Sequence, residues 1–295
     1  MRRPATGGRG SWWRGGRASA AAPLLPASAY YALFFGVPML SLFVLSFWRT
    51  HGFDLVADFA FDNYAKAVGS PLYRWLMVRT VAIGLVTACI VVPLAFALAY
   101  LMRFVFERRA VLILQLVLLS LFSGYLVRIY AWRTILGRQG LLNSTLQWLG
   151  VIDRPLEFLI YSDFAIVVTL TGLLLPLAVL PIHAAMANIA RAHIEAARDL
   201  GSSRLHLVRT ILVPMALPGV RAAFAFTFLL AAGDFVTPSL VGGAQGQMIG
   251  NIIADQFRGI GANWPLGAAL AFVTMAVVLS IYALLVGALR WVVSR

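Results

Sequence analysis

The stretch of sequence from residue 194 to residue 214 has a pattern that its long apolar neighbours lack. It begins Ile194-Glu195-Ala196-Ala197-Arg198-Asp199-Leu200-Gly201-Ser202-Ser203 and ends Ile211-Leu212-Val213-Pro214. Good helix formers precede Gly201, and a glycine suits the left-handed position just beyond the end of a helix. Either Ser202 or Ser203 then suits the N-cap of a second helix. The stretch therefore predicts two helices joined at Gly201.

The second of these helices is predicted to be amphipathic, because Leu205, Val208 and Leu212 recur at the spacing of one helical face. An ordered amphipathic pair packs either along its own bundle or into the groove of a partner. The residues alone leave both alternatives open. The polar side chains of the pair are expected on its exposed side, namely Glu195, Arg198, Arg204 and Arg209.

The whole chain is far more apolar than a soluble domain. Of its 295 residues, 61% are hydrophobic and only 12% are charged, and its mean hydropathy is +0.86. Soluble domains average about 45–50% apolar and about 25% charged residues. The composition excludes a soluble enzyme, a disordered chain and a secreted disulfide scaffold, and it is typical of an integral membrane protein.

Six apolar runs are long enough to cross a membrane as helices, which takes roughly 20 residues each. They cover residues 24–48, 80–102, 110–133, 164–190, 215–241 and 265–289. The first run is too long for the apolar core of a signal peptide. We therefore expect residues 24–48 to be the first transmembrane helix, and residues 1–23 to be a disordered, basic cytoplasmic tail. The expected fold class is all-α, a polytopic membrane protein with six transmembrane helices.

The basic residues predict how these helices are oriented. With a cytoplasmic N-terminus, fifteen of the 24 lysine and arginine residues lie in cytoplasmic segments, whereas eight of the 11 acidic residues lie outside. Cytoplasmic loops are enriched in basic residues, so both ends of the chain are expected in the cytoplasm. The net charge of +13 therefore reflects the orientation of the helices in the membrane. The basic residues do not form the stripe that would indicate nucleic-acid binding. Outside, residues 141–149 predict a short helix on the membrane surface.

The chain lacks the residues of several common chemistries. Lys66 is its only lysine, and Asp62-Asn63-Tyr64-Ala65 precedes it in place of the glycine-rich turn of a P-loop. Cys89 is its only cysteine, and its histidines are scattered without the spacing of metal ligands. We therefore expect no catalytic residue, no metal site and no cofactor in this chain.

The stretch over residues 191–214 resembles the EAA loop in the permease subunits of binding-protein-dependent ABC importers. The pattern of that loop is Glu-Ala-Ala, three residues, Gly, nine residues and Ile-x-Leu-Pro, and this chain departs from it only at Val213. The resemblance implies a type I ABC importer permease fold over residues 75–290. It also implies a coupling helix seated in a cytoplasmic ATPase, with these matching residues at the contact: Glu195, Ala196, Ala197, Gly201, Ile211 and Pro214.

The resemblance also implies the remaining parts of such an importer. A cytoplasmic ABC ATPase dimer would hold ATP and Mg, and a periplasmic or extracellular binding protein would deliver the cargo. A second, different permease would complete the pathway in the lipid of a bacterial inner membrane. This chain would then convert the motion of the ATPase into alternating access.

Asp234 is the next unusual residue, because it follows the apolar run Ala222–Gly233 and precedes Phe235-Val236-Thr237-Pro238. An acid within or at the edge of a span is a candidate functional residue. The alternative is a solvated carboxylate in the outer headgroup region. Gly233 and Pro238 are expected to break the helix here, and a broken helix is tolerated where it lines a watery cavity.

The sequence around Asp234, together with Trp264-Pro265-Leu266-Gly267 and Tyr125-Leu126-Val127-Arg128, resembles the first permease of polyamine (spermidine/putrescine) importers. A cationic cargo would account for Asp234, because a carboxylate forms charge-assisted hydrogen bonds with ammonium groups. Tyr125, Tyr130 and Trp132 would offer aromatic faces to a cation. Alternatively, these three belong to the aromatic belt at the membrane interface.

Three other functions are left open by the residues. Related permeases move other small solutes, such as amino acid derivatives, opines or ions. A secondary transporter would require ion-coupling acids within the membrane and often an internal repeat, and here Asp234 is the one candidate acid. A membrane-embedded enzyme would require clustered His, Asp or Glu at membrane depth, which the sequence does not show.

Overall fold

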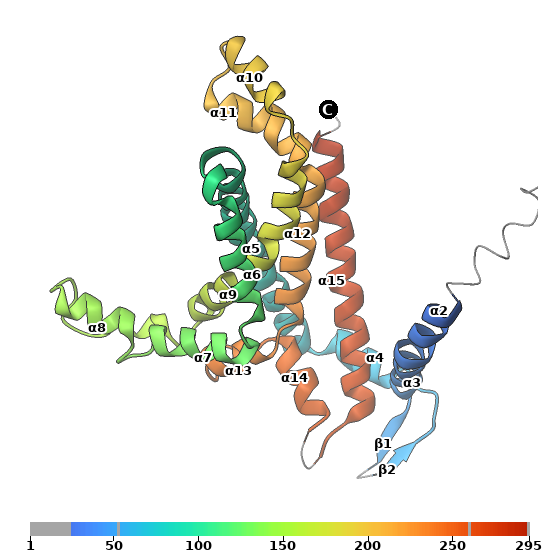
Figure 1. Cartoon of the computed structure of the whole chain (residues 1–295). Coiled ribbons are helices and arrows are strands. Elements are labelled where there is room, and N and C mark those ends of the chain that lie inside the picture. Colours follow the sequence, from blue (N-terminus) through green and yellow to red (C-terminus); the bar gives the residue numbers. More distant parts are fainter. Residues whose placement is uncertain (1–24, 52–53, 259–260, 294–295) are drawn as a thin grey trace, which may run out of the picture.

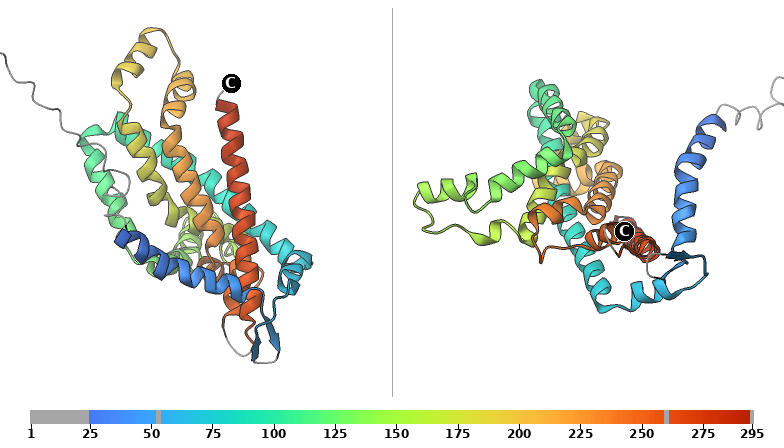
Figure 2. Two further views of the ribbon diagram at one scale, coloured as in Figure 1. Left: turned by 90° about the vertical axis from the view of Figure 1, so that its right-hand side faces the viewer. Right: turned by 90° about the horizontal axis from the view of Figure 1, so that it is seen from below.

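The computed structural model describes residues 25–51, 54–258 and 261–293. Long helices form a bundle, and two segments project from it on opposite sides (Figures 1 and 2). The tail predicted over residues 1–23 lies outside the described residues.

Three long helices that pack against one another form the centre of the bundle. They are α5 (Pro71–Tyr100), α9 (Asp163–Ala187) and α12 (Val213–Gly233). Two further helices complete the bundle: α15 (Trp264–Val293) contacts α12, and α6 (Ala110–Phe122) packs on α9.

Shorter elements connect and extend these helices. Before the bundle lie α2 (Leu25–Tyr31), the π-helical η2 (Ala32–Gly36), α3 (Val37–Leu45), β1 (Arg49–His51), β2 (Asp54–Val56) and α4 (Asp62–Gly69). Between α5 and α9 lie the π-helical η3 (Leu101–Val105), the 3-10 turn η4 (Glu107–Arg109), α7 (Tyr125–Leu136), α8 (Leu141–Trp148) and η5 (Glu157–Leu159). After α9 come α10 (Arg191–Asp199), α11 (Arg204–Leu207), the π-helical η6 (Val208–Leu212), α13 (Val236–Val241) and α14 (Ile249–Gln256).

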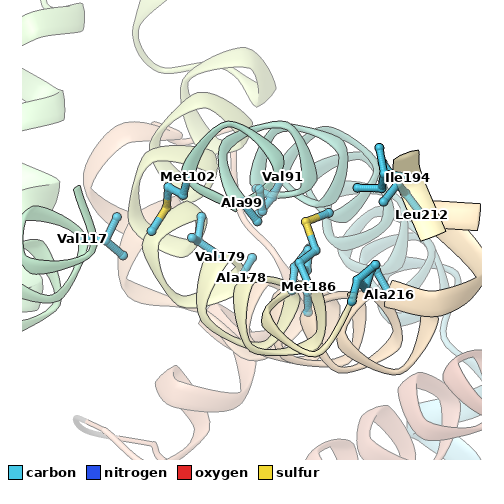
Figure 3. Packing of buried hydrophobic residues seen from close by; sticks show 14 of the residues in the cluster. Val91, Ala99, Met102, Val117, Ala178, Val179, Met186, Ile194, Leu212 and Ala216 are labelled. Carbon is cyan, nitrogen blue, oxygen red and sulfur yellow. The ribbon is translucent and has the colours of Figure 1, made fainter. Parts of the chain in front are cut away.

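Small side chains allow the central helices to approach closely. The largest buried cluster takes Ala99 from α5, Ala178 from α9 and Ala216 from α12, and it includes methionines that fill the remaining space (Figure 3). Helix interfaces in membranes are enriched in small residues, because the hydrophobic effect does not drive helices together in lipid. The packing of α5, α9 and α12 therefore depends on how closely the surfaces of these helices fit together.

α12 approaches α9 closely at Gly219, and this contact yields a prediction. A Cβ atom at this position would overlap the carbonyl oxygen of Pro181 and lie 2.7 Å from Cβ of Ala185. We expect Gly219→Val to destabilise the purified protein by about 1–3 kcal/mol, the usual cost of overpacking, measured as a lower unfolding temperature in detergent. Gly69→Val is the matched control, since a Cβ atom there meets nothing within 4 Å. Equal unfolding temperatures for the two variants would contradict the close approach.

Five helices of the described residues are long and apolar enough to cross a membrane, and a bent pair of helices makes a sixth candidate when it is counted as one span. The five are Pro26–Leu45, Pro71–Val105, Asp163–Ala187, Leu205–Gly233 and Trp264–Gly287. The bent pair joins Glu107–Phe122 to Tyr125–Trp148 at an angle of 98°.

The prediction of one helix over residues 110–133 is therefore wrong. The helix ends at Phe122, because Ser123 and Gly124 both have extended ψ values of 135°. The 13 residues of α6 are about 20 Å long at the usual rise per residue. The chain then turns, and α7 and α8 form an arm that projects from the bundle (Figure 2, green).

The prediction of one helix over residues 215–241 is also wrong at both ends. This span starts ten residues earlier, because α11, η6 and α12 are continuous from Leu205 to Gly233. It stops at Gly233, where Asp234 takes an extended conformation, and the separate helix α13 follows. The break expected at Gly233 is thus confirmed, but Pro238 lies within α13.

A two-stranded hairpin is an addition to the expected all-α fold. Strands β1 and β2 pair antiparallel, with Arg49 opposite Val56. The Asn63 side chain donates to the carbonyl oxygens of Ser46 (3.0 Å) and Trp48 (2.8 Å), which fixes α4 against the end of α3. The hairpin and α4 lie at the end of the bundle opposite α10 and α11 (Figure 1).

The first span touches the bundle mainly at its end. The ring of Phe43 contacts that of Phe272 in α15, with 5.2 Å between centroids. Farther along the helix, Tyr31, Phe35 and Leu40 are each about two-thirds exposed. An apolar surface of this extent indicates contact with lipid or with another chain.

Candidate functional site

The two helices predicted around Gly201 are present, and backbone hydrogen bonds define the turn between them. The amide of Ser202 donates to the carbonyl of Ala197 (3.0 Å) and the amide of Gly201 to that of Arg198 (2.9 Å). Gly201 has a φ of +77°. These features make a Schellman motif with glycine at its left-handed position. Ser203 is the N-cap of the next helix, because its hydroxyl oxygen accepts from the amide of His206 (3.3 Å).

This helix pair packs on its own bundle through one face. Ile194 and Ala197 of α10 are buried with Leu207 and Leu212 in the largest apolar cluster. The predicted stripe was wrong at Leu205, which is 60% exposed. The reason is the π-helical turn Val208–Leu212. Its hydrogen bonds join residues five apart, so Leu207 shares a face with Leu212.

The opposite face of the pair is open. Among the residues predicted to contact an ATPase, Glu195, Ala196, Gly201 and Pro214 are exposed, Ile211 is half-buried and Ala197 is buried. Glu195 has no hydrogen bond or ion pair within the part of the chain that the structure describes. Leu200, at the tip, is 87% exposed. A free carboxylate beside an exposed leucine is an arrangement suited to a docking contact.

Asp234 is buried at the break between α12 and α13, and its carboxylate is hydrogen-bonded locally. Oδ1 accepts from the backbone amides of Val236 (2.8 Å) and Thr237 (3.2 Å), and Oδ2 accepts from the Thr237 hydroxyl. The carboxylate therefore caps the start of α13, as acids do at helix N-termini. Asn251 of α14 donates to the carbonyl of Phe235 (2.8 Å), which holds this turn from the other side. The sequence did not predict the roles of Thr237 and Asn251, because neither side chain is charged.

A cavity of about 450 Å³ lies beside this turn, between α7, α9 and α12. Asp234 and Tyr125 both line it, and the Tyr125 hydroxyl lies 3.4 Å from the Thr237 hydroxyl. Arg128 also lines it and donates to the carbonyl of Leu173 (3.2 Å). The sequence placed Arg128 in the stretch Tyr125-Leu126-Val127-Arg128 but did not predict that it lines the cargo pathway. Its position one turn after Tyr125 is the signal that could have placed it here.

The other two aromatic candidates do not line this cavity. Tyr130 is 51% exposed on the arm. The indole of Trp132 lies against Gly172 of α9, where a Cβ atom would overlap the ring. The structure thus brings Tyr125 to Asp234 and places Tyr130 and Trp132 elsewhere.

Comparison with known proteins identifies the family. Residues 25–295 match the model of the "Binding-protein-dependent transport system inner membrane component" family. The chain belongs to this family. It is therefore a permease subunit of an ABC importer and a multi-pass inner-membrane protein, and permeases of this family are not enzymes. This family membership argues against the two alternatives of a secondary transporter and a membrane-embedded enzyme.

Individual relatives of this permease agree with the family match. The chain is 32% identical over 267 residues to the spermidine/putrescine transport system permease protein PotB of Salmonella typhimurium strain SL1344, covering 90% of each chain. It is 31% identical to PotB of Escherichia coli strain K12, covering 90% of this chain and 94% of the relative.

A solved structure shows the same fold. A bacterial ABC transporter that imports the acidic polysaccharide alginate matches the permease with a TM-score of 0.73 at 18% identity, over 90% of this chain and 93% of the other. A bacterial alginate ABC transporter in complex with an alginate pentasaccharide-bound periplasmic protein also matches, with a TM-score of 0.73 at 19% identity, over 90% of this chain and 92% of the other. The helices described above therefore have the type I ABC importer permease fold.

Proposed function

We propose that this permease imports polyamines, with spermidine and putrescine as the cargo. The observation that carries the proposal is the similarity to PotB, which extends over 90% of both chains. The cargo class follows from the name of that relative, and the cavity beside Asp234 supplies chemistry that suits it.

The chemistry of the cavity fits an ammonium group. Asp234 is the acid among the lining residues, and Tyr125 lines the cavity as well. A carboxylate binds an ammonium through charge-assisted hydrogen bonds, and an aromatic ring adds a cation–π contact. Both groups stand at a helix break, where backbone polar groups are tolerated because the break lines a cavity.

The rest of the importer is part of the same proposal. A cytoplasmic ATPase dimer, which binds ATP and Mg, docks on the exposed face of α10 and the turn at Gly201. That end of the bundle is then cytoplasmic, as are both ends of the chain, and a periplasmic binding protein delivers cargo at the opposite end. A second permease completes the pathway and covers part of the exposed face of α2 and α3. Closure of the ATPase moves the coupling helices and drives alternating access.

One observation favours a second candidate cargo, an amino acid derivative that carries both charges. Arg128 lines the same cavity as Asp234, and its Nε atom is buried without a hydrogen-bond partner. A guanidinium binds carboxylates and phosphates through paired N–H groups. A zwitterionic solute would therefore satisfy both side chains.

The proposal predicts the outcome of an uptake assay. In cells without a second polyamine system, deletion of this gene is expected to abolish the uptake of radiolabelled spermidine and putrescine, and the wild-type gene is expected to restore it. Unlabelled spermidine should compete, whereas an excess of a zwitterionic amino acid should not. Unchanged polyamine uptake after deletion would contradict the polyamine proposal. Competition by the zwitterion alone would favour the second candidate.

A further inference from the structure

Two corners of the chain meet at the end of the bundle that carries the coupling helix. One is the turn from α5 to α6, which contains η3 and η4. The other is the turn from α9 to α10, over residues 188–190. Arg103 of η3 reaches across, with Nε 3.4 Å from the carbonyl oxygen of Met186 and Nη2 3.2 Å from that of Ile189. The Arg103 side chain thus donates to two carbonyl groups, one in the last turn of α9 and one just after this helix.

An ion pair joins the same two corners a second time. Glu107, the first residue of η4, pairs with Arg191, the first residue of α10. Both side chains are about half exposed, and an exposed ion pair contributes little to folding stability. The position of the pair is more informative than its strength, because it ties the start of the coupling helix to the α5–α6 turn.

Apolar packing fills the space beneath these polar contacts. Met102, Met186, Ile189 and Ile194 are all buried in one cluster, and Figure 3 shows Met102 on the side of Val117 and Val179 and Ile194 on the side of Leu212. Protein interiors are close-packed and transmit displacement. The same cluster also takes Val91 from α5 and Val117 from α6, so we expect a shift of α10 to be transmitted to both helices through it.

We propose that Arg103, Glu107 and Arg191 form a coupling clamp, which makes the α5–α6 corner move together with the coupling helix. The three are positioning residues, since none of them lines the cavity beside Asp234. The inference rests on the proposed function, in which α10 is driven by an ATPase. Without the clamp, α10 would move while α5 and α6 lag, and ATP would be hydrolysed without transport.

Charge reversal tests the clamp in the complete transporter, reconstituted in lipid vesicles with its ATPase, second permease and binding protein. The variants are Glu107→Arg, Arg191→Glu and the double reversal, and the readout is spermidine uptake per ATP hydrolysed. Each single reversal is expected to lower this ratio about tenfold, a typical size for coupling between sites. The double reversal is expected to restore it to within about twofold, because the ion pair re-forms with opposite polarity.

Arg108→Glu is the matched control. Arg108 lies in the same turn and is exposed, and it has no ion pair within the described part of the chain. We expect this variant to keep the wild-type ratio. A wild-type ratio in either single reversal would overturn the clamp. Impaired single variants without rescue in the double variant would overturn the pairing.

The assay separates failure of the clamp from failure of the cargo proposal. If wild-type vesicles take up no spermidine, the polyamine proposal is contradicted. The clamp is then judged by the stimulation of ATP hydrolysis by the binding protein in the same proteins. Loss of stimulation in both single reversals, with recovery in the double reversal, would support the clamp, and any other pattern would overturn it.

Discussion

Replacing Gly201 by valine is expected to reduce uptake by the assembled transporter at least tenfold, while the chain still reaches the membrane. Gly201 has a φ of +77°, and no atom lies within 4 Å of a Cβ atom built there. The effect therefore comes from the backbone and not from crowding. A left-handed conformation costs an L-residue roughly 1–2 kcal/mol, and a β-branched side chain adds to this cost. The turn would relax and move Glu195 and Leu200 out of the face on which we propose that the ATPase docks.

Two further substitutions at Gly201 separate the backbone from other causes. Asn tolerates the left-handed region better than Ala or Val, so we expect uptake to decrease in the order Asn, Ala, Val. Glu195→Arg should lose uptake without changing the turn, because Glu195 is exposed. Membrane levels of each variant are measured by immunoblot. Full uptake by Gly201→Val would contradict the coupling role, and equal losses for Asn and Val would contradict the backbone explanation.

The second large effect is expected at Asp234. Asp234→Asn should reduce uptake of a polyamine about tenfold or more, seen mainly as a higher KM. Asn keeps an oxygen that can accept the amides of Val236 and Thr237, and it caps helices as well as Asp does. It removes the charge, and a hydrogen bond to a charged group is worth about 1.5–3 kcal/mol, or at least about tenfold in affinity.

The capping and cargo roles of Asp234 predict different mutant series. If Asp234 only caps α13, Asp234→Asn keeps full uptake and Asp234→Ala loses it together with folded protein. If the charge binds cargo, both variants lose uptake, and the Asn variant keeps a normal unfolding temperature. Asp255→Asn is the control for removal of an exposed acid from α14, and it should stay within about twofold of the wild type. Wild-type uptake by Asp234→Asn would remove Asp234 from the cargo site.

Local chemistry made much of the chain predictable. The turn at Gly201 and a serine cap directly after it depend on residues within a few positions of each other, so the sequence alone indicated them. The choice of Ser203 over Ser202 came from the structure. The apolar runs did the same for three of the five long spans, because a spanning helix satisfies its own backbone within one segment. The span Pro71–Val105 starts nine residues before the expected run 80–102. The break after Gly233 was predictable as well, because it depends on the residues next to it in the sequence.

Only the tertiary structure showed which distant residues meet. Tyr125 and Thr237 are 112 positions apart, and Glu107 and Arg191 are 84 apart, and no local pattern brings them together. The turn at Ser123 and Gly124 lies within a continuous apolar run. Hydropathy indicates that such a run is buried in lipid or protein, but it does not show where the chain changes direction. The placement of Leu207 on the buried face required the π-helical turn, which changes the period that a helical stripe assumes. Sequence thus determined the local turns and the membrane-spanning character of this permease. The packing of α7, α9 and α12 decided the cavity beside Asp234, and the approach of η3 and η4 to the α9–α10 turn decided the contacts of α10.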